Sequence, residues 1–156
     1  SDKDILQLVT DTVQVVSPVQ TGRRFGPEEV REKCGVPPAQ IVEWLALTGD
    51  AVDNIPGIPG LGPKTAVKLL TQFGSLTALL DRLPEVTPDR IRASLQEHRD
   101  TVRRNLDLVR LFSDVPCEWD WSKAKLRREK VELLRPFYEK WEFRSLAREL
   151  SEPQLF

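Results

Sequence analysis

The sequence has few of the side chains that carry redox or soft-metal chemistry. Its 156 residues include two cysteines, Cys34 and Cys117, which lie far apart and lack the spacing of metal ligands. We therefore expect both to be buried free thiols in a reducing compartment. The single histidine, His98, lies in a charged stretch. We expect it to be a solvated surface residue rather than a catalytic one.

Long apolar runs and an excess of one charge are also missing. No apolar run approaches the roughly 20 residues of a membrane-spanning helix, and no signal peptide is visible. With 23 basic and 24 acidic side chains the formal net charge is −1, so only a local basic patch can argue for nucleic-acid binding. There is no repeat and no low-complexity tract. These absences predict a soluble cytoplasmic protein without a membrane partner, folded as one domain over residues 1–156.

A run of alternating glycines and prolines stands between two helical stretches. Residues 56–63 read Pro-Gly-Ile-Pro-Gly-Leu-Gly-Pro, which excludes a regular helix or a central strand. We interpret the run as a tight hairpin within a helix-hairpin-helix element over about residues 41–72. Gly62 and Pro63 suit the first positions of its second helix. The side chains expected to hold the hairpin on a core are Ile55, Ile58 and Leu61.

Such a hairpin can bind the phosphate backbone of DNA. Glycine lets another molecule approach the main chain closely, and the free N–H groups at a helix start form a cradle for phosphate. Lys64 and Lys68 are four residues apart and share one face of the second helix beside this cradle. The residues that we predict to contact DNA are Gly57, Gly60, Gly62, Lys64, Thr65 and Lys68.

Four aspartates near this element suit a divalent metal. Asp50 and Asp53 are three residues apart, so both can face one ion from a helical turn, whereas Asp2 and Asp4 would share one side of an extended strand end. Mg²⁺ prefers oxygen ligands, and two-metal phosphodiester hydrolysis needs several converging carboxylates. The residues alone also allow Asp50 and Asp53 to be turn and cap residues that stabilise the local backbone.

Two motifs together resemble a known family. Residues 48–57 read Thr-Gly-Asp-Ala-Val-Asp-Asn-Ile-Pro-Gly, and residues 2–8 read Asp-Lys-Asp-Ile-Leu-Gln-Leu. In this order and separation they resemble the 5′ nucleases, the flap endonuclease and 5′→3′ exonuclease superfamily, and above all the 5′→3′ exonuclease domain of bacterial DNA polymerase I. The resemblance runs over nearly the whole chain. It implies a mainly α fold, a helix-hairpin-helix (helix–three-turn–helix) bundle, here with a short strand or hairpin near the N-terminus.

The resemblance also implies a site and its cofactors. It assigns Asp2, Asp4, Asp50 and Asp53 to the metal cluster, chiefly to its more weakly held second site, with Asp50 and Asp53 as catalytic residues. The implied cofactor of the full-length enzyme is Mg²⁺ or Mn²⁺. The hairpin at residues 55–61 is expected to hold K⁺ or Na⁺ on backbone carbonyls, a water being the alternative there.

The implied partners follow from the same family. They are double-stranded or flapped DNA, bound through its phosphate backbone, and the N-terminal half of the nuclease domain. The residues leave open whether a polymerase domain follows. The implied setting is DNA replication and repair at the nucleoid in the bacterial cytoplasm.

The chain departs from the family in one respect. The full nuclease domain has an N-terminal half with parallel strands, a first metal site and an arch, and no such half precedes Asp2. We therefore predict the DNA-binding and partial metal-binding half of a 5′→3′ exonuclease/flap endonuclease, inactive by itself. The alternative is a non-catalytic helix-hairpin-helix module that binds duplex DNA, and a helical protein–protein adaptor is a more distant third.

The remaining pattern is mostly helical. The ranges expected to form helices are 4–9, 26–35, 38–47, 64–70, 76–83, 87–97, 101–111, 130–141 and 144–150. Short strands are expected within residues 12–17 and 23–25. We expect the four tryptophans to pack in the core rather than to stack on bases. The arginines within 99–110 are interpreted as solvated surface, a contact with phosphates being the alternative. For the basic run at 123–130 a surface loop and a contact with DNA are equal alternatives.

Overall fold

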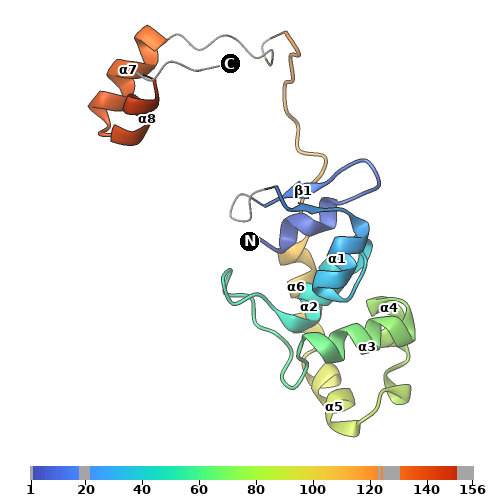
Figure 1. Ribbon diagram of the computed structural model, residues 1–156. Coiled ribbons are helices and arrows are strands. Elements are labelled where there is room, and N and C mark those ends of the chain that lie inside the picture. The colour runs from blue at the N-terminus through green and yellow to red at the C-terminus, as the bar shows by residue number, and fades with distance from the viewer. Residues whose placement is uncertain (1, 18–21, 123, 125–130, 151–156) are drawn as a thin grey trace. The chain divides into compact units, whose positions relative to one another are not determined.

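The computed structural model describes residues 2–17, 22–122, 124 and 131–150. The chain divides into two compact units, Ser1–Asp114 and Val115–Phe156, which Figure 1 shows with their helices labelled. This differs from the single domain that we expected. Residues 111–120 form no helix or strand, and all of their side chains are exposed. They therefore contribute nothing to a core, and each unit is described by itself.

The first unit begins with a short helix and a small sheet, as predicted. The 3₁₀ helix η1 (Asp4–Leu8) is followed by strands β1 (Val15–Val16) and β2 (Arg24–Phe25). The strands pair antiparallel, with Val15 opposite Phe25. Phe25 is buried, whereas Arg24 is exposed, so the sheet turns one side toward the core.

The helices of the first unit end where local chemistry stops them. Their bounds are α1 (Pro27–Cys34), α2 (Ile41–Thr48), α3 (Pro63–Phe73), α4 (Leu76–Asp81), α5 (Asp89–Glu97) and α6 (Arg99–Val109), with 3₁₀ turns η2 (Pro38–Gln40) and η3 (Leu83–Glu85). The predicted helix stop at Gly35 has a φ of 80°, which suits glycine. The predicted cap Ser75 accepts a hydrogen bond from the N–H of Ala78 on its Oγ, at 3.1 Å.

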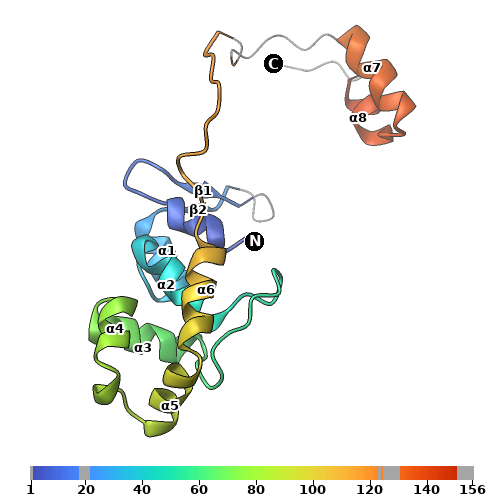
Figure 2. The same cartoon turned by 180° about the vertical axis from the view of Figure 1, so that it is seen from behind.

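Helix α2 lies at the centre of the first unit. It is apolar on nearly every side, and it packs mainly on α6 and α3, with η1 as a further neighbour. Figure 2 shows α6 running alongside α2. Each fully buried aliphatic side chain contributes roughly 1.5–3 kcal/mol to the free energy of unfolding. The fully buried leucines and isoleucine of the core are Leu6, Ile41, Leu45, Leu47, Leu70, Leu76, Leu79 and Leu95.

The second unit contains helices α7 (Val131–Lys140) and α8 (Arg144–Glu149). Its described aromatic side chains contact one another rather than a deep core: the rings of Phe137 and Phe143, for example, have centroids 6.5 Å apart. The prediction that all four tryptophans are buried is therefore wrong. Trp44 is buried in the first unit, but the three tryptophans that follow residue 114 are 58–77% exposed.

The expected solvent exposure of Cys117 and of His98 needs correction. Cys34 is buried as expected, but Cys117 is exposed because it lies in the irregular segment. His98 is half-buried at the junction of α5 and α6, and its Nδ1 lies 3.0 Å from the carbonyl oxygen of Ser94. The basic residues within 123–130 lie outside the described residues. Among the described residues, no helix is long and apolar enough to span a bilayer.

Candidate metal centre and nucleic-acid interface

Asp50 follows Gly49, the C-cap of α2, and begins a closed turn. Its N–H donates to the carbonyl of Ile55 at 2.9 Å, and the N–H of Ile55 donates back at 2.8 Å. The four residues between them form the turn. Asp50 and Asp53 are therefore held by a β-bridge and its turn, and the prediction that they share a helical turn is wrong. We call residues 50–55 the acidic turn.

Two glycines make this exit from α2 possible. Gly49 has a φ of 71°, and a Cβ built on it would lie 2.3 Å from the backbone nitrogen of Gly57. A Cβ on Gly57 would lie 2.2 Å from the carbonyl oxygen of Thr48. The two main chains are thus in direct contact, which only glycine permits at both positions. Gly57 is required for the packing of the loop on the end of α2, whatever contact it makes with DNA.

The N-terminal segment brings a third carboxylate to the acidic turn. Helix η1 packs on α2, and Asp4 is its first residue. One carboxylate oxygen each of Asp4, Asp50 and Asp53 lies within 4.8 Å of the others. These three residues form the carboxylate cluster. The structure therefore assembles three of the four predicted metal ligands, from segments more than 40 residues apart in the sequence.

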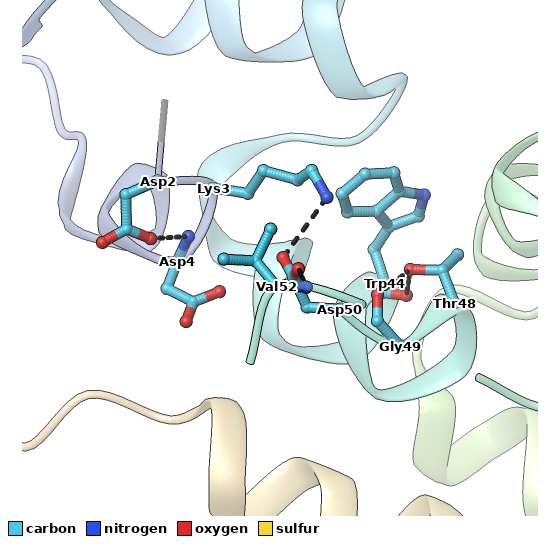
Figure 3. Close-up of polar contacts among 8 residues, drawn as sticks. All are labelled: Asp2, Lys3, Asp4, Trp44, Thr48, Gly49, Asp50 and Val52. Carbon is cyan, nitrogen blue, oxygen red and sulfur yellow. Dashed lines mark hydrogen bonds and ion pairs between the residues drawn. The ribbon is translucent and has the colours of Figure 1, made fainter. Parts of the chain in front are cut away.

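Asp2 is placed differently from the other three. Its Oδ1 accepts a hydrogen bond from the N–H of Asp4 at 3.2 Å. Figure 3 shows the Asp4 carboxylate directed toward Asp50, with the Asp2 carboxylate beside the Asp4 backbone nitrogen. Because Asp4 begins a 3₁₀ helix, the prediction that Asp2 and Asp4 project from an extended strand end is wrong.

Asp50 is an ionised, well-anchored member of the cluster. It is only 6% exposed; its Oδ1 accepts from the N–H of Val52 at 3.0 Å and its Oδ2 from Nζ of Lys3 at 3.3 Å. The hydrogen bond from Val52 is the main cause that lowers the pKa of Asp50, and Lys3 adds to it against the opposing effect of burial. The bond to Val52 is also that of a turn residue, so Asp50 stabilises its loop as well.

Asp4 is in the opposite electrostatic situation. Burial raises its pKa most, and the negative charges of Asp2, Asp53 and Asp50 raise it further, while Lys3 lowers it. Its Oδ1 is buried and has no hydrogen-bond partner among the described residues. An oxygen in this position among like charges is stabilised by a cation. Three carboxylates are also the donor set that Mg²⁺ and Mn²⁺ prefer, so these residues fit such an ion.

The hairpin follows the acidic turn and leads into α3. Ile58 and Leu61 are 2% and 4% exposed, and the N–H of Ile58 donates to the carbonyl of Leu47 at 2.9 Å. These contacts pin the loop on the core as predicted, and Ile55 packs partly buried against the same core. The element spans α2 to α3, residues 41–73.

The outer side of the hairpin carries free donors. In the part of the chain described, the N–H groups of Gly60, Gly62 and Lys64 donate to no protein acceptor, and all three residues are exposed. A Cβ on Gly62 would meet no atom within 4 Å, so another molecule can approach the main chain there. Thr65 differs, because its N–H donates to the carbonyl of Gly62 at 3.0 Å. Lys68 is exposed on the next turn of α3.

A comparison with family models identifies the chain. Residues 36–132 match the model described as 5′-3′ exonuclease, C-terminal SAM fold, and this match covers well over half of the chain. The chain belongs to the 5′–3′ exonuclease family. The family and the mainly α fold with an N-terminal strand pair, both predicted from the sequence, are thereby confirmed.

Relatives of this member of the 5′–3′ exonuclease family include DNA polymerases I and a 5′-3′ exonuclease. The chain is 43% identical over 148 residues to the thermostable DNA polymerase I of Thermus filiformis. This aligned region covers 95% of this chain and 18% of that protein. It is 35% identical over 151 residues to the 5′-3′ exonuclease of Aquifex aeolicus, covering 97% of this chain and 50% of that protein. The chain thus spans half or less of the length of these relatives.

Solved structures of bacteriophage T5 proteins share the fold. T5 5′-exonuclease with bound zinc matches with a TM-score of 0.64 and 30% identity, covering 69% of this chain and 40% of that one. The T5 D15 flap endonuclease, in a pseudo-enzyme–product complex with DNA and metal ions, matches with a TM-score of 0.63 and 29% identity, over the same shares. Both neighbours therefore contain bound metal ions, which are zinc in the first.

Sequence reasoning missed two residues that contact the acidic turn or its flanks. Lys3 lies inside the Asp-Lys-Asp motif, and its pairing with Asp50 depends on the packing of η1 on α2. Asn105 is fully buried on α6 and contacts the loop after α2. It could have been found, since it lies three residues after Val102 and four before Val109 on the apolar face of a helix.

Proposed function

We propose that this chain is the DNA-holding part of a 5′→3′ exonuclease/flap endonuclease and supplies part of its metal site. One observation carries the proposal: two acids of the carboxylate cluster, Asp50 and Asp53, and two exposed donors of the hairpin, Gly60 and Gly62, lie on one continuous loop, residues 49–62. A DNA-holding element and a metal-binding element are thus joined without an intervening helix. The T5 flap endonuclease, bound to DNA and metal ions, supports the same assignment.

The hairpin would hold DNA by its backbone. The N–H groups of Gly60, Gly62 and Lys64 would donate to phosphate oxygens, and the ammonium groups of Lys64 and Lys68 would add charge beside them. None of these groups reads a base. Binding should therefore be weak, independent of sequence and dependent on salt, with a slope of about 0.9 log units per contacted phosphate.

Asp4, Asp50 and Asp53 would hold Mg²⁺ or Mn²⁺ and act as the metal-binding acids of the reaction. When bound, such an ion polarises a phosphodiester and lowers the pKa of a bound water. Asp50 stays ionised and is fixed by Val52, while Asp53 is exposed and would face the DNA side. Asp2 is not among the carboxylates that lie within 4.8 Å of one another, and its Oδ1 accepts from the N–H of Asp4, so its role would be to orient Asp4.

We also propose that the hairpin binds K⁺ or Na⁺ through those of its backbone carbonyl oxygens that accept no hydrogen bond from the protein. The carbonyls of Ile55, Pro56, Ile58 and Pro59 already accept hydrogen bonds from the protein. Those at positions 57, 60 and 61 accept none within the described residues. Anomalous scattering from a thallium-soaked crystal should give a peak beside these carbonyls; a water at the same place would contradict the proposal.

A 5′-flap cleavage assay tests the main proposal. The chain would be compared alone and joined to the part of the Aquifex aeolicus 5′-3′ exonuclease that lies outside the match. We expect Mg²⁺- or Mn²⁺-dependent cleavage only from the joined protein, and its loss in Asp50→Ala. Asp89→Ala, which removes an exposed aspartate on α5, is the matched control. Cleavage by the chain alone, abolished by Asp50→Ala, would instead make these aspartates a sufficient site.

A non-catalytic DNA-binding module is the second candidate. It is favoured by the two bonds of Asp50, to Val52 and Lys3, which satisfy that carboxylate without a metal. In that case Asp50→Ala would destabilise the acidic turn and weaken duplex binding. The joined protein would cleave no flap, and the chain would not bind Mn²⁺.

A further inference from the structure

Asn105 is a buried polar side chain in an apolar place. It is 0% exposed, and its neighbours on the same face of α6, Val102 and Val109, are 0% and 1% exposed. An amide side chain in such a position lowers stability unless it is hydrogen-bonded. Its contacts therefore indicate why the position is not aliphatic.

The amide of Asn105 joins two points of the chain. Nδ2 donates to the carbonyl of Ala46 at 3.0 Å and to the carbonyl of Pro56 at 2.7 Å. Both acceptors are carbonyls, which fixes the orientation of the amide, and both protons of the NH₂ group are used. The carbonyl oxygen of Asn105 is buried without a partner among the described residues.

The carbonyl of Ala46 needs this partner. It lies in the last turn of α2, where the N–H four residues ahead would normally donate to it. That N–H belongs to Asp50 and donates to Ile55 instead. The neighbouring carbonyls of Leu45 and Leu47 accept from Gly49 and Ile58. Asn105 thus completes the capping of α2 with a side chain from another helix.

The bonds of Asn105 enclose the acidic turn. The segment between Ala46 and Pro56 contains Asp50 and Asp53, and the hairpin begins immediately after it. Asn105 holds both ends of this segment to α6, and among the described residues it hydrogen-bonds to no carboxylate of the cluster and to no exposed donor of the hairpin.

We propose that Asn105 is a positioning residue that fixes the acidic turn and the hairpin relative to each other. Its loss leaves two carbonyls unpaired and frees both ends of the segment, so the turn and the hairpin loosen together. The expected loss of DNA and metal affinity rests on the proposed function. The expected loosening of the backbone at the turn and the hairpin does not depend on it.

The test compares Asn105→Leu, which has the same branched skeleton of heavy atoms and cannot donate, with Val102→Ala on the same helix. Both destabilise the core, but only the first removes the two bonds. We expect the amides of Asp50, Ile55 and Ile58 to exchange with deuterium about tenfold faster in Asn105→Leu, below its unfolding transition, and not in Val102→Ala. If Asn105→Leu fails to fold, Asn105→Ser serves instead, because it removes the NH₂ group with a smaller change of polarity.

The same proteins would be titrated with Mn²⁺ and with a duplex oligonucleotide. Asn105→Leu should lose about fivefold or more in each affinity, while Val102→Ala of equal melting temperature keeps both. Equal exchange rates in the two variants would overturn the positioning role. An unmutated chain that binds neither Mn²⁺ nor duplex would refute the proposed function, and the exchange comparison would still decide the role of Asn105.

Discussion

Replacing Lys3 with methionine is expected to tighten divalent-cation binding at the carboxylate cluster. Nζ of Lys3 lies 3.3 Å from Oδ2 of Asp50. An ion that binds beside Asp50 is repelled by this ammonium or displaces it. Methionine keeps an extended side chain of similar length, so Lys3→Met removes the positive charge together with its hydrogen bond to Asp50 and little packing.

The size of the effect follows from Coulomb's law. Charges of +1 and +2 about 5 Å apart repel by roughly 1.7 kcal/mol in water. The water value applies because the Lys3 side chain is 42% exposed. With a Debye length of about 10 Å at 0.1 M salt the repulsion falls to roughly 1 kcal/mol, and at 0.01 M salt it stays near 1.4 kcal/mol. We therefore expect Mn²⁺ to bind about fivefold tighter at 0.1 M salt and about tenfold tighter at 0.01 M.

The concentration of free Mn²⁺ in a titration at pH 7, measured by electron paramagnetic resonance, gives the affinity of each variant for Mn²⁺. Lys68→Met is the matched control, because it makes the same charge change on α3, outside the cluster. The loss of the ion pair itself should cost less than about 1 kcal/mol of stability. Equal or weaker Mn²⁺ binding by Lys3→Met would refute the reasoning, as would a gain without salt dependence or one shared by Lys68→Met.

Three other perturbations have defined outcomes. The double variant Lys64→Ala/Lys68→Ala should lose most of its duplex binding. The slope of log affinity against log salt concentration should become shallower by about 0.9 per lost phosphate contact, as measured by fluorescence anisotropy. Duplex binding equal to that of the parent would exclude the hairpin as the contact. Gly49→Ala should cost roughly 2 kcal/mol or more in urea unfolding, since its Cβ meets main chain, whereas Gly62→Ala should cost less than about 1 kcal/mol; equal costs would contradict the close contact. Because the folded-state pKa of Asp4 is raised, its ionisation opposes folding at neutral pH and has no effect at a pH below both its folded and unfolded values. Asp4→Asn should therefore raise the melting temperature in EDTA at pH 7 but not at pH 3, and a gain at both would point to another cause.

Much of the fold could be predicted because its signals are local. The stop of α1 at Gly35 and the cap of α4 at Ser75 depend on residues within a few positions of each other. The family motifs are local too, and they led to Asp4, Asp50 and Asp53. Periodicity likewise placed most helices within a few residues of their observed ends.

The features that were missed depend on packing that neither periodicity nor a motif reports. The Asp50–Ile55 bridge replaces the expected helical turn because Gly49 leaves α2 in contact with Gly57. Asn105 acts on residues 49 and 59 positions away, which no local pattern reports. The exposure of the tryptophans beyond residue 114 could not be predicted from composition, because the presence of an aromatic residue does not show whether it lies in a core or on a surface.

The contact between the two glycines has a consequence for how this loop can change. At most packed positions a larger side chain can be accommodated by shrinking a neighbouring one, so that a second substitution suppresses the first. At Gly49 and Gly57 the nearest atoms belong to main chain, which no substitution can shrink. A genetic search for suppressors of Gly49→Ala should therefore return reversions to glycine rather than compensating side chains. Gly49 and Gly57 are therefore fixed points of the loop that no second substitution can replace.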